Sequence, residues 1–155
     1  MARLEHGERI GKTAALHVGC AAIIFDETGE KILLTRRADN GKWCLPGGGM
    51  EAGESAAEAC IREVWEETGL TIAVTRLIGV YSTPHRITIY NDGNRFQFVS
   101  LAFEARIVEG TPGLSDEVTD VGFFTRNEIA AINLMENHRE RIEDVYAAQP
   151  AAFIR

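Results

Sequence analysis

Three glutamates, Glu63, Glu66 and Glu67, lie three and four residues apart in a segment that contains neither glycine nor proline. At this spacing the side chains of a helix are neighbours, and like charges destabilise the helix by roughly 0.2–0.5 kcal/mol per pair. They also fall in the second half of the expected helix, where the carbonyl end disfavours negative charge by about 0.3–1 kcal/mol per residue. A bound cation would offset both effects. The cluster therefore predicts a cation site, although alone it would be interpreted as a solvated acidic face.

Local signals predict the helix that carries these glutamates over residues 56–68. Ser55 and Glu58 form a capping box, in which each side chain accepts a hydrogen bond from a backbone N–H at the helix start. Gly69 stands where a left-handed residue ends a helix. At about 100° per residue, the glutamates share one face with Ala59, and we expect that face to be exposed. The opposite, apolar face consists of Ala57, Cys60, Ile61, Val64 and Thr68.

Residues 48–70 match a longer pattern. Gly48 is followed by five residues and Glu54, and then by seven residues and the run 62–70, REVWEETGL. This spacing resembles the box of the Nudix (MutT-like) family, Gly-x5-Glu-x7-Arg-Glu-U-x-Glu-Glu-x-Gly-U with U apolar, at every defined position. A looser resemblance extends over residues 17–133. It implies an α/β Nudix fold, an α/β/α sandwich with a mixed β-sheet, in which the box forms a loop, a helix and a loop.

The resemblance also implies a reaction, the metal-dependent hydrolysis of the pyrophosphate in a nucleoside diphosphate linked to another group X. Divalent cations neutralise the phosphate charge, orient the phosphates and acidify a bound water. Mg²⁺ prefers hard oxygen ligands, so a few carboxylates suffice to hold it. By this resemblance the ligands of Mg²⁺ or Mn²⁺ are the carboxylates of Glu63, Glu66 and Glu67 and the carbonyl of Gly47.

Other residues acquire roles from the same resemblance. Glu63 is also the candidate base, Arg62 matches the arginine that holds a box glutamate in place, and Glu54 matches an outer glutamate that supports the site. Family members often add a base or ligand from a later loop. Here we expect Glu117, with Asp116 and Asp120 as neighbours. An exposed acidic loop is an equal alternative for that segment.

Contacts to the substrate are expected outside the box. Arg36 and Arg37 follow a strand and could contact phosphates, and Tyr81, Tyr90 or Phe98 could stack on a base. Surface arginines and core aromatics are the simpler interpretation of these residues. His85 is expected to be a surface or packed histidine.

Composition restricts the class of protein. The chain of 155 residues fits one domain, which we assign to residues 17–155 after an N-terminal extension of residues 1–16. Its net charge of −7 argues against a nucleic-acid polymer or an anionic membrane as partner. A small nucleotide brought with a divalent ion is the expected substrate.

Cysteine usage and the absence of apolar runs bear on location. Cys20, Cys44 and Cys60 are widely spaced, and we expect buried free thiols in a reducing compartment. We find neither a signal peptide nor a membrane-spanning run. We therefore expect a cytoplasmic protein, and by analogy with the family a homodimer.

Periodicity predicts more strands than helices. Strands are expected at residues 17–25, 31–37, 71–81, 85–90, 95–108 and 121–124, and further helices at 126–133 and 135–148. The first strand should be buried on both faces because its apolar run hardly alternates. The run 91–94, NDGN, is a strong hairpin signal. Hairpins combined with one strand-to-helix crossover favour a mixed sheet with helices on its faces over a doubly wound fold.

Two substrate classes stay open. An ADP-ribose or nucleotide-sugar pyrophosphatase is slightly favoured, because related enzymes carry a proline at about the distance that separates Pro84 from Leu70. The alternative is a nucleotide-sanitising triphosphatase that removes oxidised dGTP, which suits the small size of the chain. A different class is a non-hydrolytic nucleotide-binding sensor domain. Degenerate box glutamates would favour that class, whereas here the box is intact.

Overall fold

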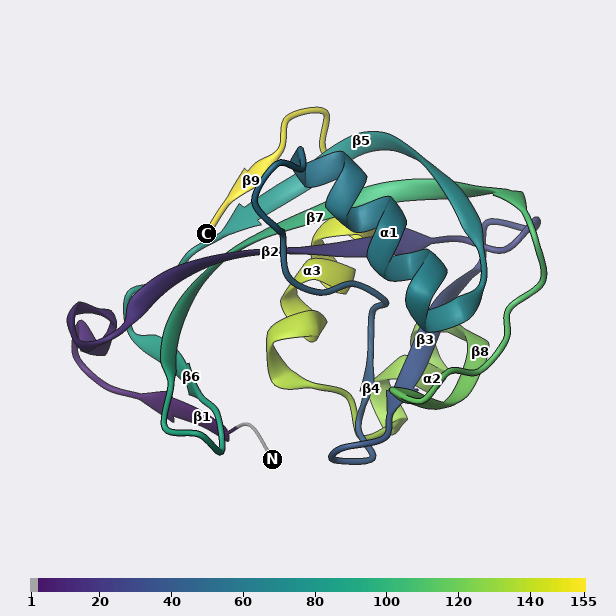
Figure 1. Cartoon of the computed structure of the whole chain (residues 1–155). Coiled ribbons are helices and arrows are strands. Elements are labelled where there is room, and N and C mark those ends of the chain that lie inside the picture. The colour runs from purple at the N-terminus through teal and green to yellow at the C-terminus, as the bar shows by residue number, and fades with distance from the viewer. Residues whose placement is uncertain (1–2) are drawn as a thin grey trace.

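The computed structural model describes residues 3–155. Figure 1 shows its elements, which in chain order are β1 (Arg3–His6), the 3₁₀-helix η1 (Ile10–Thr13), β2 (Ala15–Ile24), β3 (Lys31–Arg37), β4 (Trp43–Cys44), α1 (Ala56–Thr68), β5 (Thr71–Tyr81), β6 (Arg86–Ile89), β7 (Arg95–Glu109), β8 (Val118–Thr125), α2 (Arg126–Ala131), α3 (Glu136–Ala147) and β9 (Phe153–Ile154). The bounds predicted for α1, β3 and β5 are confirmed. The other predicted elements shift at their ends by up to three residues.

The strands form two sheets. Six of them make a mixed sheet in the order β1-β6-β7-β5-β9, with β2 joined to β7, and the other sheet has the order β4-β3-β8. Strand β2 runs parallel to β7, and β9 runs parallel to β5. The predicted mixed sheet is confirmed, whereas the division into two sheets was not predicted. It depends on which distant strands pair, and local periodicity does not contain that information.

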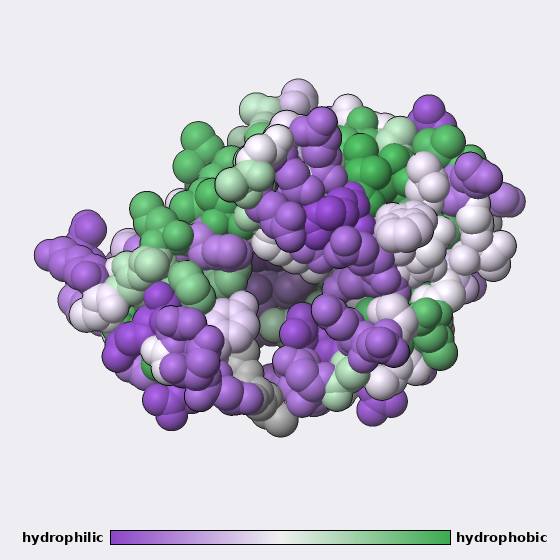
Figure 2. All heavy atoms as spheres, in the orientation of Figure 1, coloured by the Kyte–Doolittle hydropathy of each residue, from purple (hydrophilic) through white to green (hydrophobic). Residues whose placement is uncertain are grey.

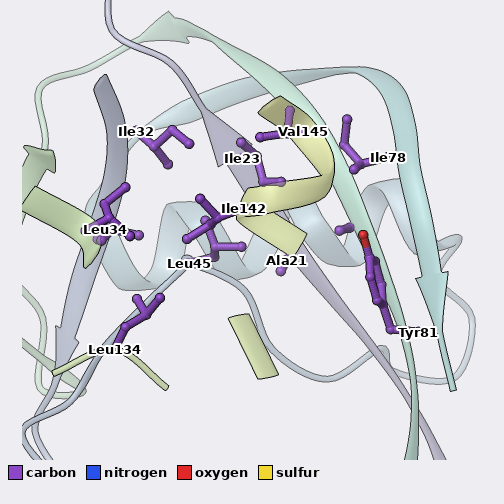
Figure 3. Packing of buried hydrophobic residues seen from close by; sticks show 12 residues of the cluster. Ala21, Ile23, Ile32, Leu34, Leu45, Ile78, Tyr81, Leu134, Ile142 and Val145 are labelled. Carbon is purple, nitrogen blue, oxygen red and sulfur yellow. The ribbon is translucent and has the colours of Figure 1, made fainter. Parts of the chain in front are cut away.

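Strand β2 contributes to two hydrophobic cores, because successive side chains of a strand point to opposite faces of the sheet. On one face Ala21 and Ile23 pack with Ile142 and Val145 of α3 (Figure 3). On the other face Cys20, Ala22 and Ile24 share a second core with α1, which contributes Ala59, Cys60 and Val64. From Gly19 to Ile24 the strand is buried on both faces, as predicted, whereas His17 is half-buried and Val18 is exposed. Helices α1 and α3 cover opposite faces of it, which gives the α/β/α arrangement.

The ends of the chain add strands that the sequence did not predict. Residues Arg3–His6, in the segment assigned to an N-terminal extension, form β1 and pair with β6 in four register positions. At the other end β9 pairs with β5 through Phe153 and Ile154. Both strands are short, and their pairing is decided by distant partners, so neither shows in the local pattern.

Two further predictions concern the interior. The three cysteines are buried and free, as expected. Within residues 3–155, none of the helices has the length and the apolar character that crossing a membrane would need.

Candidate active site

Helix α1 presents its glutamates from a well-defined start and end. Both hydrogen bonds of the predicted capping box are present, from Glu58 N to Ser55 Oγ at 3.3 Å and from Ser55 N to Glu58 Oε2 at 2.8 Å. Gly69 ends the helix in the left-handed region, with φ of 73°. The predicted exposure of the glutamate face is wrong in part, because Glu67 is only 6% exposed and Ala59 is fully buried. A loop of the chain covers that side of the helix.

This covering segment, residues 46–50, is called the glycine loop below. It runs along β2 through three backbone hydrogen bonds, from Ala22 N to Pro46 O, from Cys20 N to Gly48 O and from Met50 N to Val18 O. Gly47 has φ of +147°, and a Cβ there would lie 2.3 Å from the carbonyl oxygen of Cys20. A Cβ at Gly48 would lie 2.4 Å from the Glu63 carboxyl group. Only glycine allows the backbone to approach this closely.

The close approach brings backbone against the box carboxylates. The N–H of Gly47 donates to Glu67 Oε2 at 3.0 Å. This bond holds the Glu67 side chain against the loop, and Glu63 lies against Gly48 beside it. Glu63 and Glu67 are thus positioned by α1 on one side and by the glycine loop on the other.

Arg62 organises the remaining carboxylates. A guanidinium has five N–H donors in a planar fork, and here each one is used. The five bonds run from Nε to Glu54 Oε1 (2.6 Å), from Nη2 to Glu54 Oε2 (3.0 Å) and the Gly49 carbonyl (2.9 Å), and from Nη1 to Glu63 Oε1 (3.0 Å) and Glu66 Oε2 (3.1 Å). The bidentate pair lowers the pKa of Glu54 to about 2. Arg62 therefore fixes the orientations of Glu54, Glu63 and Glu66 together.

Burial and mutual repulsion perturb the inner carboxylates. Desolvation raises the pKa of Glu63, and the charges of Glu66 and Glu117 raise it further against the opposing effect of Arg62. Desolvation also raises the pKa of Glu67 to about 7, with Glu63 and Glu117 adding to the shift. The structure thus brings Glu117, from the loop before β8, within electrostatic reach of two box glutamates. Asp116 and Asp120 are exposed.

The chemistry of these donors fits a hard divalent cation. Four carboxylates and a glycine backbone face one region, and they belong to Glu63, Glu66, Glu67, Glu117 and Gly47. All of the atoms that these groups could offer a cation are oxygens, the ligand type that Mg²⁺ and Mn²⁺ prefer. Within residues 3–155, no three His, Cys, Asp or Glu side chains are already gathered as a metal centre. Arg62 instead holds oxygens of Glu63 and Glu66. Desolvation raises the pKa values of Glu63 and Glu67, and the neighbouring carboxylates raise them further, so a cation bound here would stabilise the charged forms.

A cleft opens beside the glycine loop. It is lined by all three of Gly47, Gly48 and Gly49, by residues of β1, β6 and β7, and by the first turns of α3. Figure 2 shows the surface hollowed at this place below α1, with mostly hydrophilic residues around the opening. A substrate bound here would lie against the backbone that touches the box carboxylates.

The predicted substrate contacts separate into two groups in the structure. Arg37, Tyr81 and Phe98 line the cleft. Arg37 also forms a bidentate ion pair with Asp39, at 2.9 and 3.0 Å. Arg36 lies outside the cleft lining and donates to the carbonyl of Gly41 at 3.0 Å. Arg36 is therefore the predicted contact that the structure does not bring to the cleft.

The aromatic candidates differ in their surroundings. Tyr81 is only 4% exposed, and its hydroxyl donates to Asp144 Oδ2 at 2.9 Å. Phe98 contacts the ring of His17, with ring centroids 5.1 Å apart. Phe96 and Tyr90 extend this aromatic wall of the cleft. Phe98 is thus in the better position to contact a planar group.

Sequence reasoning missed the wall contributed by α3. Asn137, His138 and Arg141 line the cleft, and Arg86 of β6 joins them. A signal for them exists in the helical period, because His138, Arg141, Ile142 and Val145 are spaced as one buried face. A histidine and an arginine at buried positions of an otherwise apolar face indicate a polar site.

Comparisons with known proteins agree with this geometry. A sequence model of the NUDIX domain matches residues 15–146. An ADP-ribose pyrophosphatase of Methanocaldococcus jannaschii is 36% identical over 132 residues, which cover 83% of this chain and 73% of that protein. A putative 8-oxo-dGTP diphosphatase of Bacillus subtilis is 39% identical over 93 residues, 60% of this chain and 59% of that one. A solved NUDIX hydrolase from Nitrosomonas europaea superposes with a TM-score of 0.70 at 28% identity, covering 86% of this chain and 90% of that one. The chain belongs to the Nudix family of hydrolases.

Proposed function

We propose that this hydrolase cleaves the pyrophosphate bond of a nucleoside diphosphate linked to another group X, with ADP-ribose or a nucleotide sugar as the first substrate to test. The observation that carries the proposal is the cleft beside the box, which combines basic and aromatic side chains. Its arginines are Arg3, Arg37, Arg86 and Arg141. In a chain of net charge −7, four arginines at one cleft favour an anionic ligand.

Within this proposal, Mg²⁺ or Mn²⁺ is held by Glu63, Glu66, Glu67 and the carbonyl of Gly47. Such an ion, when bound, neutralises phosphate charge and acidifies a coordinated water. Glu63 accepts the proton of the attacking water, a role that suits a carboxyl group whose pKa burial raises above its ordinary value.

Other side chains support this chemistry. Arg62 positions Glu63 and Glu66 through its two Nη1 bonds and receives its own alignment from Glu54. Glu117 supplies a further carboxylate to the same region. Phe98 and its aromatic neighbours offer faces on which a nucleobase stacks, an interaction in which every base can take part.

The substrate class is supported by the M. jannaschii relative, whose name is ADP-ribose pyrophosphatase. A second candidate is the hydrolysis of oxidised dGTP, because the B. subtilis relative is named a putative 8-oxo-dGTP diphosphatase. The first is preferred because the matching region covers 83% of this chain, against 60% for the second.

The test is a panel of dinucleotides, nucleotide sugars, ADP-ribose and nucleoside triphosphates, incubated with Mg²⁺ or Mn²⁺. Release of a mononucleotide from ADP-ribose or a nucleotide sugar supports the proposal, and hydrolysis in ¹⁸O-labelled water identifies the phosphorus attacked. Glu63→Gln should lower kcat by about 10²–10⁴-fold, the range for loss of a general base. Glu51→Gln, at an exposed position in the loop before α1, is the matched control and should keep full activity.

Two outcomes count against the assignment. Full activity in Glu63→Gln would show that another group accepts the proton. Nucleotide binding without cleavage anywhere on the panel would favour the sensor class instead.

We further propose that the protein is cytoplasmic and forms a homodimer. The three buried free thiols agree with the proposed location. Light scattering at several protein concentrations tests the dimer.

A further inference from the structure

Arg141 is an uncompensated cation in the wall of the cleft. It is 4% exposed, and its Nε has no hydrogen-bond partner among the described residues. Within residues 3–155 it takes part in no ion pair. Arg62, by contrast, places all five of its donors on protein oxygens. Arg62 thus completes the box, whereas Arg141, in the wall of the cleft, has no anionic partner among residues 3–155.

The surroundings of Arg141 add positive charge. Burial and the charge of Arg86 lower the pKa of Arg141 to about 10, so it still carries its proton at neutral pH. The charges of Arg141, Arg86 and Arg37 all act on His138, which lies one turn before Arg141 on α3. Three arginines therefore converge on one stretch of the cleft. Within residues 3–155, only Arg37 of the three has a carboxylate partner, Asp39.

One polar atom near Arg141 also lacks a partner among the described residues. Asn137, one turn earlier on α3 and on the same face, has a buried Oδ1 without a hydrogen bond. Both residues line the cleft, as does Arg86. The positive end of the α3 dipole lies at this end of the helix and favours an anion in the same place. The ring of Tyr81 lies against Arg141 in a cation–π contact, with its centroid 5.4 Å from the guanidinium carbon.

A buried charge without a partner destabilises a fold, and substitution by an apolar residue of similar volume relieves that cost. The Tyr81 ring compensates only part of it, since a cation–π contact is weaker than an ion pair with a buried carboxylate. The presence of the buried Arg141 guanidinium is explained if its anionic partner is a bound ligand. The planar fork of arginine matches the oxygens of a phosphate or a carboxylate.

We infer that Arg141, Asn137 and Arg86 form an oxyanion subsite, which binds a phosphate or carboxylate group of the substrate away from the box carboxylates. This inference rests on the proposed function, because it places the substrate in the cleft. Two sources supply such a group. One is an additional anionic substituent on X or on the nucleoside, and the other is the diphosphate itself.

The first experiment needs no turnover. Binding of inorganic phosphate and pyrophosphate is measured by calorimetry and by the shift in Tm, with chelator present and ionic strength held with chloride. Wild type should be stabilised by at least one of these anions. Arg141→Met should bind that anion at least tenfold more weakly and, without anion, should melt at a higher temperature than wild type. The matched control is Arg139→Met, an exposed arginine on the same helix, which should behave as wild type.

This binding experiment also separates a ligand-binding role from a structural one. A lower Tm in Arg141→Met, with anion binding retained, would assign Arg141 a packing role and overturn the inference. The absence of anion binding by wild type would overturn it as well. If Arg141→Met fails to fold, Arg141→Lys keeps the charge but loses the fork, and it should bind the anion more weakly than wild type while remaining folded.

The second experiment identifies the source of the anion with matched substrates. UDP-glucose and UDP-glucuronate differ by one carboxylate, and ADP-ribose and its 2′-phosphate differ by one phosphate. If the subsite binds an additional substituent, wild type has the higher kcat/KM for the more anionic member, and Arg141→Met removes at least tenfold of that preference. If it binds the diphosphate, the variant loses kcat/KM equally on both members. Unchanged kinetics on every cleaved pair overturns the inference.

The two proposals fail in different ways. Wild type that binds anions through Arg141 but cleaves no member of the panel refutes the hydrolytic proposal and leaves the subsite standing. Wild type that cleaves nucleotide sugars while Arg141→Met matches it in binding and in kinetics refutes the subsite alone.

Discussion

His138 is a titratable side chain whose neutral form the fold requires. Its Nδ1 accepts a hydrogen bond from the backbone N–H of Leu45 at 3.1 Å. Desolvation and the charges of Arg141, Arg37 and Arg86 hold its pKa well below the ordinary 6.5. Below pH 6.5 His138 is therefore protonated in the unfolded chain but stays neutral in the folded chain. The free energy of unfolding should fall with decreasing pH, by at most about 1.4 kcal/mol per pH unit from this group.

The pH dependence of the free energy of unfolding is measured by urea unfolding between pH 5.5 and 8. The wild type is compared with His138→Asn, whose side-chain oxygen replaces the Nδ1 acceptor. The wild type should lose stability relative to the variant below pH 6.5, and their difference should be constant above it. The comparison is needed because Glu67, with its pKa raised to about 7, contributes with the opposite sign in this range. A difference that does not change with pH would show that His138 is protonated or solvated in the folded protein.

Single residues were predictable from sequence where their spacing is local. Arg62 lies one residue from Glu63 and four from Glu66, so one helix brings all three together. Arg141 meets Arg86 and Tyr81 only because α3 packs on the sheet. The burial of Glu67 has the same kind of cause, since the glycine loop covers it from outside the helix. Contacts set by tertiary packing are not written in a local pattern.

The glycine loop depends on backbone space at Gly47. In Gly47→Ala the new Cβ would meet the backbone of Cys20 at 2.3 Å and that of Ala21 at 2.7 Å. Gly53→Ala is a matched control, since Gly53 also has positive φ, +96°, but nothing lies within 4 Å of its Cβ position. Conformational strain alone costs about 1–3 kcal/mol at either site. We expect Gly47→Ala to lose more stability than Gly53→Ala in urea unfolding and, unlike the control, to lose most of its activity.

Equal stability of the two alanine variants would mean that the loop moves away from β2 without a cost in free energy.

The helices and strands were predictable from sequence to the extent that residues within each element specify it. Helix α1 has a capping box and a terminal glycine within its own sequence, so its bounds were predicted correctly. Strand β1 becomes a strand only by pairing with β6, eighty or so residues away along the chain.

At the scale of the whole molecule, the first strand closes one side of the cleft. Arg3 and Leu4 of β1 line it, and β1 holds β6 by four register pairs, whereas β6 and β7 share two. Gly7 N and Gly11 N donate to the carbonyls of His85 and Pro84, so the segment also secures the turn before β6. Residues 3–13, which contain β1 and η1, are called the N-terminal arm below. Glu63, Glu66 and Glu67 of the box are on α1, which does not pair with this arm. Under the proposed function, substrate binding and bond cleavage therefore depend on different parts of the fold.

Deletion of residues 1–14 should therefore raise KM and leave kcat within about a factor of two. Loss of one exposed charge contact is worth about 0.2–1 kcal/mol, which corresponds to a rise in KM of up to about fivefold, and mobility of β6 adds to it. Arg3→Gln in the full chain separates the two contributions, since it removes the charge but keeps the strand. Kinetics on the substrate identified by the panel, with hydrogen exchange over residues 86–89, measure both. A fall in kcat at unchanged KM would show that the arm acts on the box and not on the bound nucleotide.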